Sequence, residues 1–127
     1  MQAHDVLIVD DSPEIRQLLR LTLAGAGVRL REATAGDQAL ALMERELPDL
    51  VILDVMMPGE VDGIAVCRRI RADARSASVR IILLSARGQQ ADIAAGMAAG
   101  ANAYVVKPFS PAALQATVFN LLNGKSA

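Results

Sequence analysis

Four short apolar segments, each followed by polar or turn-forming residues, constrain the fold of this chain most strongly. They are VLIV at 6–9, LVIL at 50–53, IILL at 81–84 and YVV at 104–106. Short runs rich in β-branched residues favour strands over helices. Because none of these runs carries a charge at alternate positions, both faces of each strand are predicted to be covered. That arrangement is typical of a parallel sheet with helices on both sides.

A fifth segment, VRLREA at 28–33, has a different pattern, because Arg29 and Arg31 alternate with Val28 and Leu30. Charged side chains at alternate positions are typical of a strand at the edge of a sheet. We therefore place this second strand of the chain at an edge.

Helical segments are predicted between the strands. A Ser-Pro pair at 12–13 and another at 110–111 each supply an N-cap residue followed by a proline in the first turn. Apolar residues follow each pair at helical spacing, and segments near 37–46, 63–73 and 89–99 complete the alternation. The chain is therefore predicted to be an α/β domain, a five-stranded parallel sheet in the order 2-1-3-4-5, doubly wound by five helices.

Polar side chains end four of the predicted strands. Asp10 and Asp11 follow the first strand, Asp54 the third, Ser85 the fourth and Lys107 the fifth. In an open parallel sheet, ligands bind beyond the carboxyl ends of the strands, at the point where the strand order reverses. We therefore expect these residues to share one cleft.

Three carboxylates in one cleft repel one another. A like-charged pair at about 4 Å costs ~1 kcal/mol in water and ~4 kcal/mol at an effective dielectric constant of about 20. The cluster therefore predicts a bound cation, to which Lys107 adds positive charge. Oxygen ligands without histidine or cysteine favour a hard ion, and a site with few protein ligands plus water and phosphate suits Mg²⁺ better than Ca²⁺.

Composition excludes several other classes of protein. Thirteen basic and fourteen acidic residues give a net charge of -1, which argues against a nucleic-acid-binding domain, so we expect no direct nucleic-acid partner. No signal-type or membrane-spanning segment occurs, and Cys67 is the single cysteine. We expect a cytoplasmic location and no membrane partner. No linker interrupts the chain, so one domain over 1–127 without an effector domain is expected.

The polar residues at the strand ends belong to longer motifs. DD at 10–11, LDVMMPG at 53–59, SA at 85–86 and YVVKPF at 104–109 resemble the signature set of the response-regulator receiver domain, in its order and approximate spacing. The resemblance covers essentially the whole chain. It implies a flavodoxin-like fold and a phosphorylation-controlled switch of two-component signalling, a protein that catalyses only its own phosphorylation and dephosphorylation.

The resemblance also implies a role for each site residue. Asp54 would accept a phosphoryl group from a histidine kinase or a histidine phosphotransfer protein in a Mg²⁺-dependent reaction, which gives an aspartyl phosphate. Asp11 and Asp54 would bind Mg²⁺ directly, Asp10 directly or through water, and Met56 through its backbone carbonyl. Lys107 would pair with a phosphoryl oxygen, and the family often has a cis bond from this lysine to the following proline.

In the switch that the resemblance implies, the Ser85 hydroxyl moves to a phosphoryl oxygen and the Tyr104 ring turns inward to fill the space behind it. The output face would consist of the fourth helix, the fifth strand and the fifth helix, and would bind a downstream protein target. The basic run of Arg68, Arg69, Arg71 and Arg75 is interpreted as a solvated helix face, with a docking patch as the open alternative.

The chain departs from the family pattern at two places, and other functions stay open. The loop DVMMPGEVDG has one extra residue near Glu60-Val61, and Ser85 replaces the commoner threonine. A phosphorelay shuttle that passes the phosphoryl group to a histidine phosphotransfer protein would use the same site. A hydrolase with a DxD motif or a flavin binder fits poorly, because DDSPE at 10–14 lacks that spacing and is not rich in hydrogen-bond donors.

Overall fold

Strands and helices alternate along the chain in the computed structural model, which describes residues 3–57 and 62–124. The strands are β1 (His4–Val9), β2 (Val28–Ala33), β3 (Leu50–Asp54), β4 (Arg80–Ser85) and β5 (Ala103–Val106). The helices are α1 (Pro13–Leu23), α2 (Gly36–Arg45), α3 (Gly63–Ala72), α4 (Gln90–Ala98) and α5 (Pro111–Leu122). The predicted alternation is confirmed.

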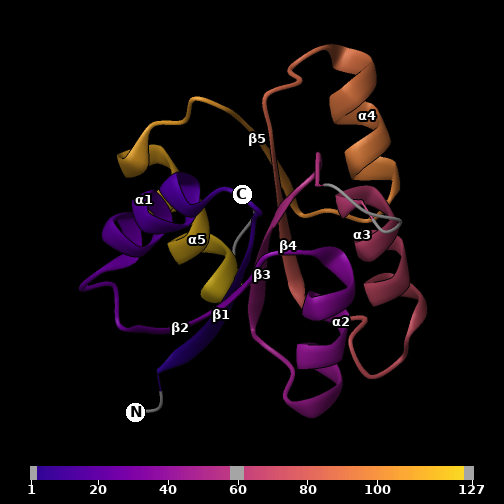
Figure 1. Cartoon of the computed structure of the whole chain (residues 1–127), viewed down its shortest axis with the longest axis horizontal. Helices are drawn as coiled ribbons and strands as arrows, with labels where there is room; N and C mark the ends of the chain where they lie inside the picture. Colours follow the sequence, from indigo (N-terminus) through magenta and orange to yellow (C-terminus); the bar gives the residue numbers. More distant parts are fainter. Residues whose placement is uncertain (1–2, 58–61, 125–127) are drawn as a thin grey trace.

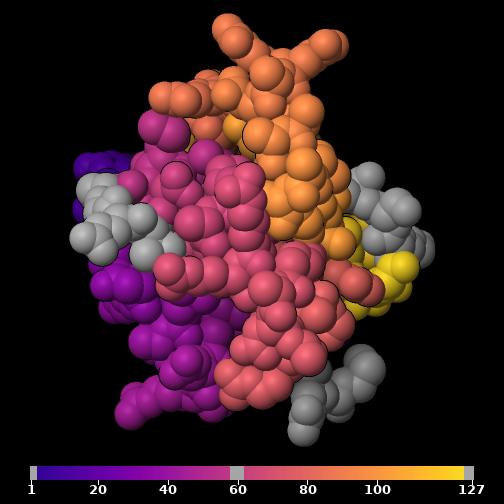
Figure 2. Space-filling view, turned by 90° about the vertical axis from the view of Figure 1, so that its right-hand side faces the viewer, coloured from indigo at the N-terminus to yellow at the C-terminus, as the bar shows by residue number. Residues whose placement is uncertain are grey.

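The five strands form one parallel sheet in the order β2-β1-β3-β4-β5, which confirms the predicted topology. Helices α1 and α5 cover one face of the sheet, and α2, α3 and α4 cover the other (Figure 1). In a view turned by 90°, α2, α3 and α4 form one continuous side of the molecule (Figure 2). The strand order reverses between β1 and β3, so a ligand site is expected above these two strands.

Alternate residues of each central strand point into two separate cores, as the uninterrupted apolar runs predicted. In β1, Leu7 and Val9 belong to the core under α2 and α3, whereas Val6 and Ile8 belong to the core under α1 and α5. All four are completely buried. Large aliphatic side chains provide the driving force, since each fully buried one contributes about 1.5–3 kcal/mol of transfer free energy.

Strand β2 lies at the edge, as its alternating arginines predicted. Arg29 forms ion pairs with Asp5 on β1 and with Glu46 after α2, and Nη2 of Arg31 donates to the Glu46 carbonyl. The exposed Arg29 side chain thus keeps charge on this edge strand, which disfavours pairing with another strand.

Both predicted Ser-Pro helix starts are confirmed. The Ser12 hydroxyl accepts a hydrogen bond from the backbone N–H of Ile15 at 3.2 Å, and the Ser110 hydroxyl accepts one from Ala113 at 3.2 Å. Each cap satisfies a backbone donor that the first turn of a helix leaves unpaired. Among the described residues, no helix is both long and apolar enough to cross a bilayer.

Candidate functional site

The ends of β1 and β3 bring three carboxylates together. Asp10 directly follows β1, Asp54 ends β3, and the register pairs Val9 with Leu53, one residue earlier on each strand. Asp10, Asp11 and Asp54 each offer an oxygen atom, and these atoms all lie within 4.8 Å of one another. We call these three residues the acidic cluster. Its convergence follows from the strand order, because Asp10 and Asp54 end neighbouring parallel strands.

Lys107, which directly follows β5, completes this site. Its Nζ atom lies 3.2 Å from Oδ2 of Asp10 and 3.4 Å from Oδ1 of Asp54. The two carboxylates are nearly inaccessible to solvent, at 1% and 3% exposure. The Lys107-Pro108 peptide bond is cis, as the resemblance implied. One ammonium group therefore bridges two buried acids that form no other ion pair within residues 3–57 and 62–124.

The electrostatics of Asp54 reflect this burial. Desolvation, followed by repulsion from Asp10, raises the pKa of the Asp54 carboxyl from 3.8 to about 6, although Lys107 and the backbone N–H of Met56 oppose the rise. That N–H donates to Oδ1 of Asp54 at 3.2 Å, while the N–H of Ser12 donates to Oδ1 of Asp10 at 2.9 Å. Since a nearby cation stabilises ionised carboxylates, the acidic cluster is electrostatically suited to bind one.

The predicted switch residues are joined through one loop residue, Arg87. The hydroxyl of Ser85, a fully buried residue at the end of β4, accepts a hydrogen bond from the Arg87 N–H at 3.0 Å. The Tyr104 hydroxyl donates to the Arg87 carbonyl at 2.8 Å. The Lys107 N–H donates to the Ser85 carbonyl at 2.7 Å, so Ser85 is tied to the backbone of the site lysine.

The Asp62-Gly63 pair at the start of α3 shapes the site, although no role was predicted for it from the sequence. The Asp62 side chain caps α3 by accepting from the Ala65 N–H at 2.8 Å. A Cβ atom on Gly63 would lie 2.2 Å from the backbone oxygen of Asp54. Glycine is thus required where α3 begins against the end of β3. The DG pair at 62–63 is the signal that could have indicated this close approach.

Some predictions are not tested by this geometry. Met56 is 51% exposed and contacts Asp54 through its N–H, and its carbonyl as a metal ligand remains a prediction. The extra residue near Glu60-Val61 lies outside the described residues. Of the basic run, Arg68, Arg69 and Arg75 are exposed as predicted. Arg71 is not: its guanidinium donates to backbone and side-chain oxygens around the α4–β5 turn.

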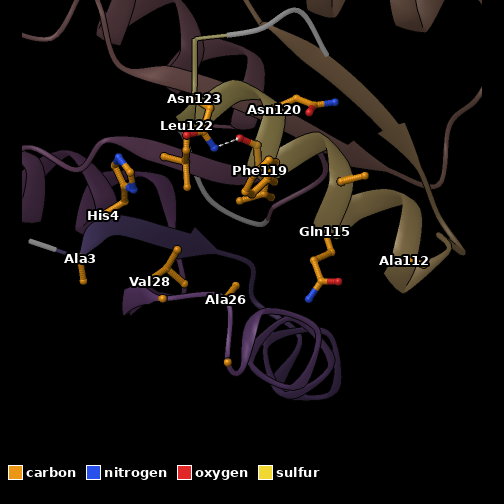
Figure 3. Close-up of a pocket in the computed structure, with 14 residues that line it drawn as sticks. Ala3, His4, Ala26, Val28, Ala112, Gln115, Phe119, Asn120, Leu122 and Asn123 are labelled. Atoms are coloured by element: carbon orange, nitrogen blue, oxygen red, sulfur yellow. Dashed lines mark hydrogen bonds between the residues drawn. The ribbon is translucent and has the colours of Figure 1, made fainter. Parts of the chain in front are cut away.

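A larger hollow lies elsewhere and does not contain the acidic cluster. It has a volume of about 890 Å³ and is lined mainly by α5 and by residues 25–28, together with His4 (Figure 3). His4 begins β1, whereas Asp10 follows its end. The hollow is therefore at the opposite end of the sheet from the candidate site.

A doubly wound sheet with an acidic cluster and a bridging lysine at its switch point is the arrangement of a receiver domain. The chain belongs to this family, since the model of the response regulator receiver domain matches residues 6–119. Members act in two-component regulatory systems, and aspartyl phosphate and Mg²⁺ binding at an acidic pocket are features of the family.

Two relatives are named as a probable transcriptional regulator and as a DNA-binding response regulator. The transcriptional regulator ycf27 of Guillardia theta is 48% identical over 113 residues, which cover 89% of this chain and 43% of that protein. The DNA-binding response regulator MtrA of Mycolicibacterium smegmatis is 42% identical over 113 residues, which cover 89% of this chain and 48% of MtrA. The chain thus spans less than half the length of either relative.

Among solved structures, the signal receiver domain of a signal transduction histidine kinase from Syntrophus aciditrophicus has a TM-score of 0.89. It is 32% identical, and the match covers 96% of this chain and 92% of that one. The flavodoxin-like fold predicted from the resemblance is confirmed.

The relatives correct one prediction. The near-zero net charge led us to expect no nucleic-acid partner, and this expectation is wrong, because the relative MtrA is a DNA-binding response regulator and the relative ycf27 is named a transcriptional regulator. The net charge was calculated for the residues of this chain alone, and it carries no information about other parts of a longer protein. The relatives are about twice as long as the part that matches this chain, so the charge of this domain does not describe how such proteins bind DNA.

Proposed function

We propose that this chain is the receiver of a response regulator and takes up a phosphoryl group on Asp54. The observation that carries this proposal is the set of distances around Asp54: a lysine ammonium at 3.4 Å and two further carboxylates with oxygen atoms within 4.8 Å. A buried carboxylate held beside an ammonium group and a potential cation site is a suitable nucleophile for phosphorus. The phosphodonor is a phosphohistidine of a histidine kinase or of a histidine phosphotransfer protein.

The acidic cluster fits Mg²⁺, because its donor set consists of carboxylate oxygens that face one another. Asp10, Asp11 and Asp54 would hold the ion, with the Met56 carbonyl as a further ligand. When bound, Mg²⁺ supplies positive charge that neutralises the phosphoryl oxygens.

The protein residues divide the remaining work. An oxygen of the Asp54 carboxylate forms a bond to phosphorus, while the bond from phosphorus to the donor's imidazole nitrogen breaks and the nitrogen keeps the electron pair. Lys107 shifts from Asp54 to a phosphoryl oxygen and offsets charge there. The nucleophile must be ionised, and a pKa of about 6 for Asp54 leaves most of it ionised at neutral pH. The protein in this role is a switch, since it transforms no substrate beyond its own phosphodonor.

The phosphoryl group would act on the loop that joins Ser85 to Tyr104. To bind a phosphoryl oxygen, the Ser85 hydroxyl gives up its hydrogen bond with the Arg87 N–H. The Arg87 carbonyl accepts from the Tyr104 hydroxyl, so movement of this residue is transmitted to the tyrosine. The result is a population shift of the surface formed by α4, β5 and α5.

This output surface suits a partner that binds through apolar contacts. Residues 88–124 contain two charged residues, Asp92 and Lys107, although charged residues make up 21% of the chain. Two large apolar side chains on α4 and β5 are exposed: Met97 at 44% and Val106 at 38%. Burying them against a downstream protein segment costs no desolvation of charge.

The relatives favour transcription as the controlled process, since ycf27 is named a transcriptional regulator and MtrA a DNA-binding response regulator. A phosphorelay shuttle is the second candidate, and the match to a receiver domain of a histidine kinase favours it. The two roles use the same site and differ in where the phosphoryl group goes next.

Intact-mass measurement after incubation with acetyl phosphate tests the proposal. With Mg²⁺, the wild-type chain and Asp92→Asn should each gain one acid-labile phosphoryl group, whereas Asp54→Asn and wild type in EDTA should not. Equal labelling of Asp54→Asn would remove Asp54 as the acceptor. Incubating the phosphorylated chain with candidate histidine phosphotransfer proteins then separates the roles, because a shuttle loses its label to them and a terminal switch retains it.

A further inference from the structure

Helix α4 contains a glycine in its middle that its own helical structure does not require. Gly96 lies among residues of high helix propensity, mainly alanine, and glycine is among the least favourable residues inside a helix. Its φ is not in the left-handed region, which four other glycines of the described segments adopt. Gly96 is also the one buried residue of α4. A packing requirement, not the backbone conformation, therefore explains this glycine.

The packing partner is the ring of Tyr104 on β5. A Cβ atom at position 96 would lie 2.7 Å from Cδ2 and 3.0 Å from Cε2 of that ring, and 2.9 Å from Cδ1 of Leu83. The Leu83 methyl group ends a flexible side chain and can give way. The ring is rigid and is held at both ends, by β5 and by the hydrogen bond from its hydroxyl to the Arg87 carbonyl.

We propose that Gly96 is a positioning residue, whose missing side chain forms the seat for the Tyr104 ring and thereby couples the place of α4 to the orientation of that ring. In this arrangement, the Tyr104 side chain contacts both α4, at Gly96, and the β4–α4 loop, at the Arg87 carbonyl. Adding a methyl group at position 96 expels the ring or displaces α4, and the hydrogen bond to Arg87 is lost in the first case. The residue at position 96 thus sets the balance between two arrangements of this surface. The packing of the Tyr104 ring against Gly96 is inferred from these contacts alone. Its role in signalling rests on the function proposed above.

The chain offers a direct probe, because Tyr104 is its single tyrosine and it has no tryptophan. Protein labelled with 3-fluorotyrosine therefore gives ¹⁹F signals from this ring alone. In the unphosphorylated state, Gly96→Ala should shift that resonance away from its wild-type position. Ala94→Ser, which adds an atom at an exposed position of the same helix, should leave the resonance unchanged. An unchanged resonance in folded Gly96→Ala would overturn the proposal.

A thermal-unfolding comparison covers the case in which Gly96→Ala folds poorly. Combined with Tyr104→Leu, which removes the ring, Gly96→Ala should no longer lower Tm and should raise it, because alanine favours the helix. An equal loss of Tm in both backgrounds would show that the ring is not what the new methyl group meets, and would also overturn the proposal.

The experiments distinguish an error in the proposed packing of Tyr104 against Gly96 from an error in the proposed function. Once intact mass confirms that Asp54 is phosphorylated, the wild-type ¹⁹F resonance should move. If it stays fixed while Gly96→Ala still shifts it, the seat is supported and the role of Tyr104 in switching is wrong. If phosphorylation moves the resonance and Gly96→Ala does not, the switch is supported and the seat is wrong.

Discussion

The Nζ atom of Lys107 lies 3.4 Å from Oδ1 of Asp54, although the two residues are 53 positions apart in the chain. The same ammonium group lies 3.2 Å from Asp10. The lysine is therefore part of the electrostatic balance of the resting site as well as a candidate partner for the phosphoryl group.

Replacing Lys107 should lower the stability of the folded chain. Lys107→Met leaves the carboxylates of Asp10 and Asp54 without their bridging cation, and breaking a partly buried pair in this way should cost about 1–3 kcal/mol of unfolding free energy. Urea unfolding in EDTA measures the loss, and added Mg²⁺ should recover part of it. Arg75→Met, which removes an exposed pair with Asp73, should cost less than about 0.5 kcal/mol. Equal losses in the two variants would contradict this interpretation.

The pKa of Asp54 predicts a pH dependence of stability. The folded-state pKa, about 6, lies above the ordinary value of 3.8, so the folded chain binds this proton more tightly than the unfolded chain. Stability from this group is complete below about pH 4 and is lost as pH rises through 6. Asp54→Asn should therefore stabilise the metal-free protein by up to about 3 kcal/mol at pH 8, and by little near pH 4.

Urea unfolding in EDTA at both pH values measures that difference. Asp73→Asn is the control, because hydrogen bonds from the backbone and side chain of Arg75 lower the pKa of Asp73, so no stabilisation with rising pH is expected. A stabilisation by Asp54→Asn that is the same at both pH values would show that burial does not raise this pKa.

Metal binding should depend on Asp11, the exposed member of the acidic cluster. At ten times the dissociation constant, Mg²⁺ should stabilise the wild-type chain by about 1.4 kcal/mol, since it binds the folded state alone. Asp11→Asn should lose most of the resulting rise in Tm, whereas Asp92→Asn should keep it. Thermal unfolding across a Mg²⁺ titration measures both, and an unchanged response of Asp11→Asn would argue against this residue as a ligand.

Gly63→Ala should disturb the site without touching a charged group. The new Cβ atom would lie 2.2 Å from the backbone oxygen of Asp54, and backbone in a packed sheet yields little, so we expect a loss of about 1–3 kcal/mol. Phosphorylation by acetyl phosphate should slow because the Asp54 backbone shifts. Gly25→Ala is a useful contrast, since Gly25 has a positive φ but open space around it; it should lower stability and leave the phosphorylation rate unchanged.

Arg71→Ala should destabilise the chain more than Arg68→Ala, although the two arginines are only three positions apart on α3. Arg71 donates to the Gly100 carbonyl at 2.8 Å and to Oδ1 of Asn102 at 2.7 Å. Losing these charge-assisted bonds should cost about 2–4 kcal/mol. Exposed Arg68 should cost less than about 0.5 kcal/mol. Chemical denaturation distinguishes the two, and similar values would mean that Arg71 is a surface residue after all.

Arg71 also illustrates where prediction from the sequence stopped. A run of arginines near the end of a helix is typical of a solvated helix face. Arg68 and Arg69 on α3 fit that interpretation, whereas exposed Arg75 lies beyond the end of the helix. Arg71 instead turns toward the α4–β5 turn and donates to the backbone carbonyl of Gly100, which is 29 positions away in the chain. Local periodicity carries no information about those partners.

The strands and the acidic cluster could be predicted, because apolar runs and the polar residues that end them are adjacent in the chain, and parallel strands place equivalent ends at one edge. That much the sequence determined by itself. The tertiary structure alone decided that Gly63 lies against the Asp54 backbone, that Gly96 lies against the Tyr104 ring, and that burial beside Asp10 raises the pKa of Asp54. These properties depend on distances between segments that are remote in the sequence and on the exclusion of water. Tertiary packing alone sets those distances and excludes the water.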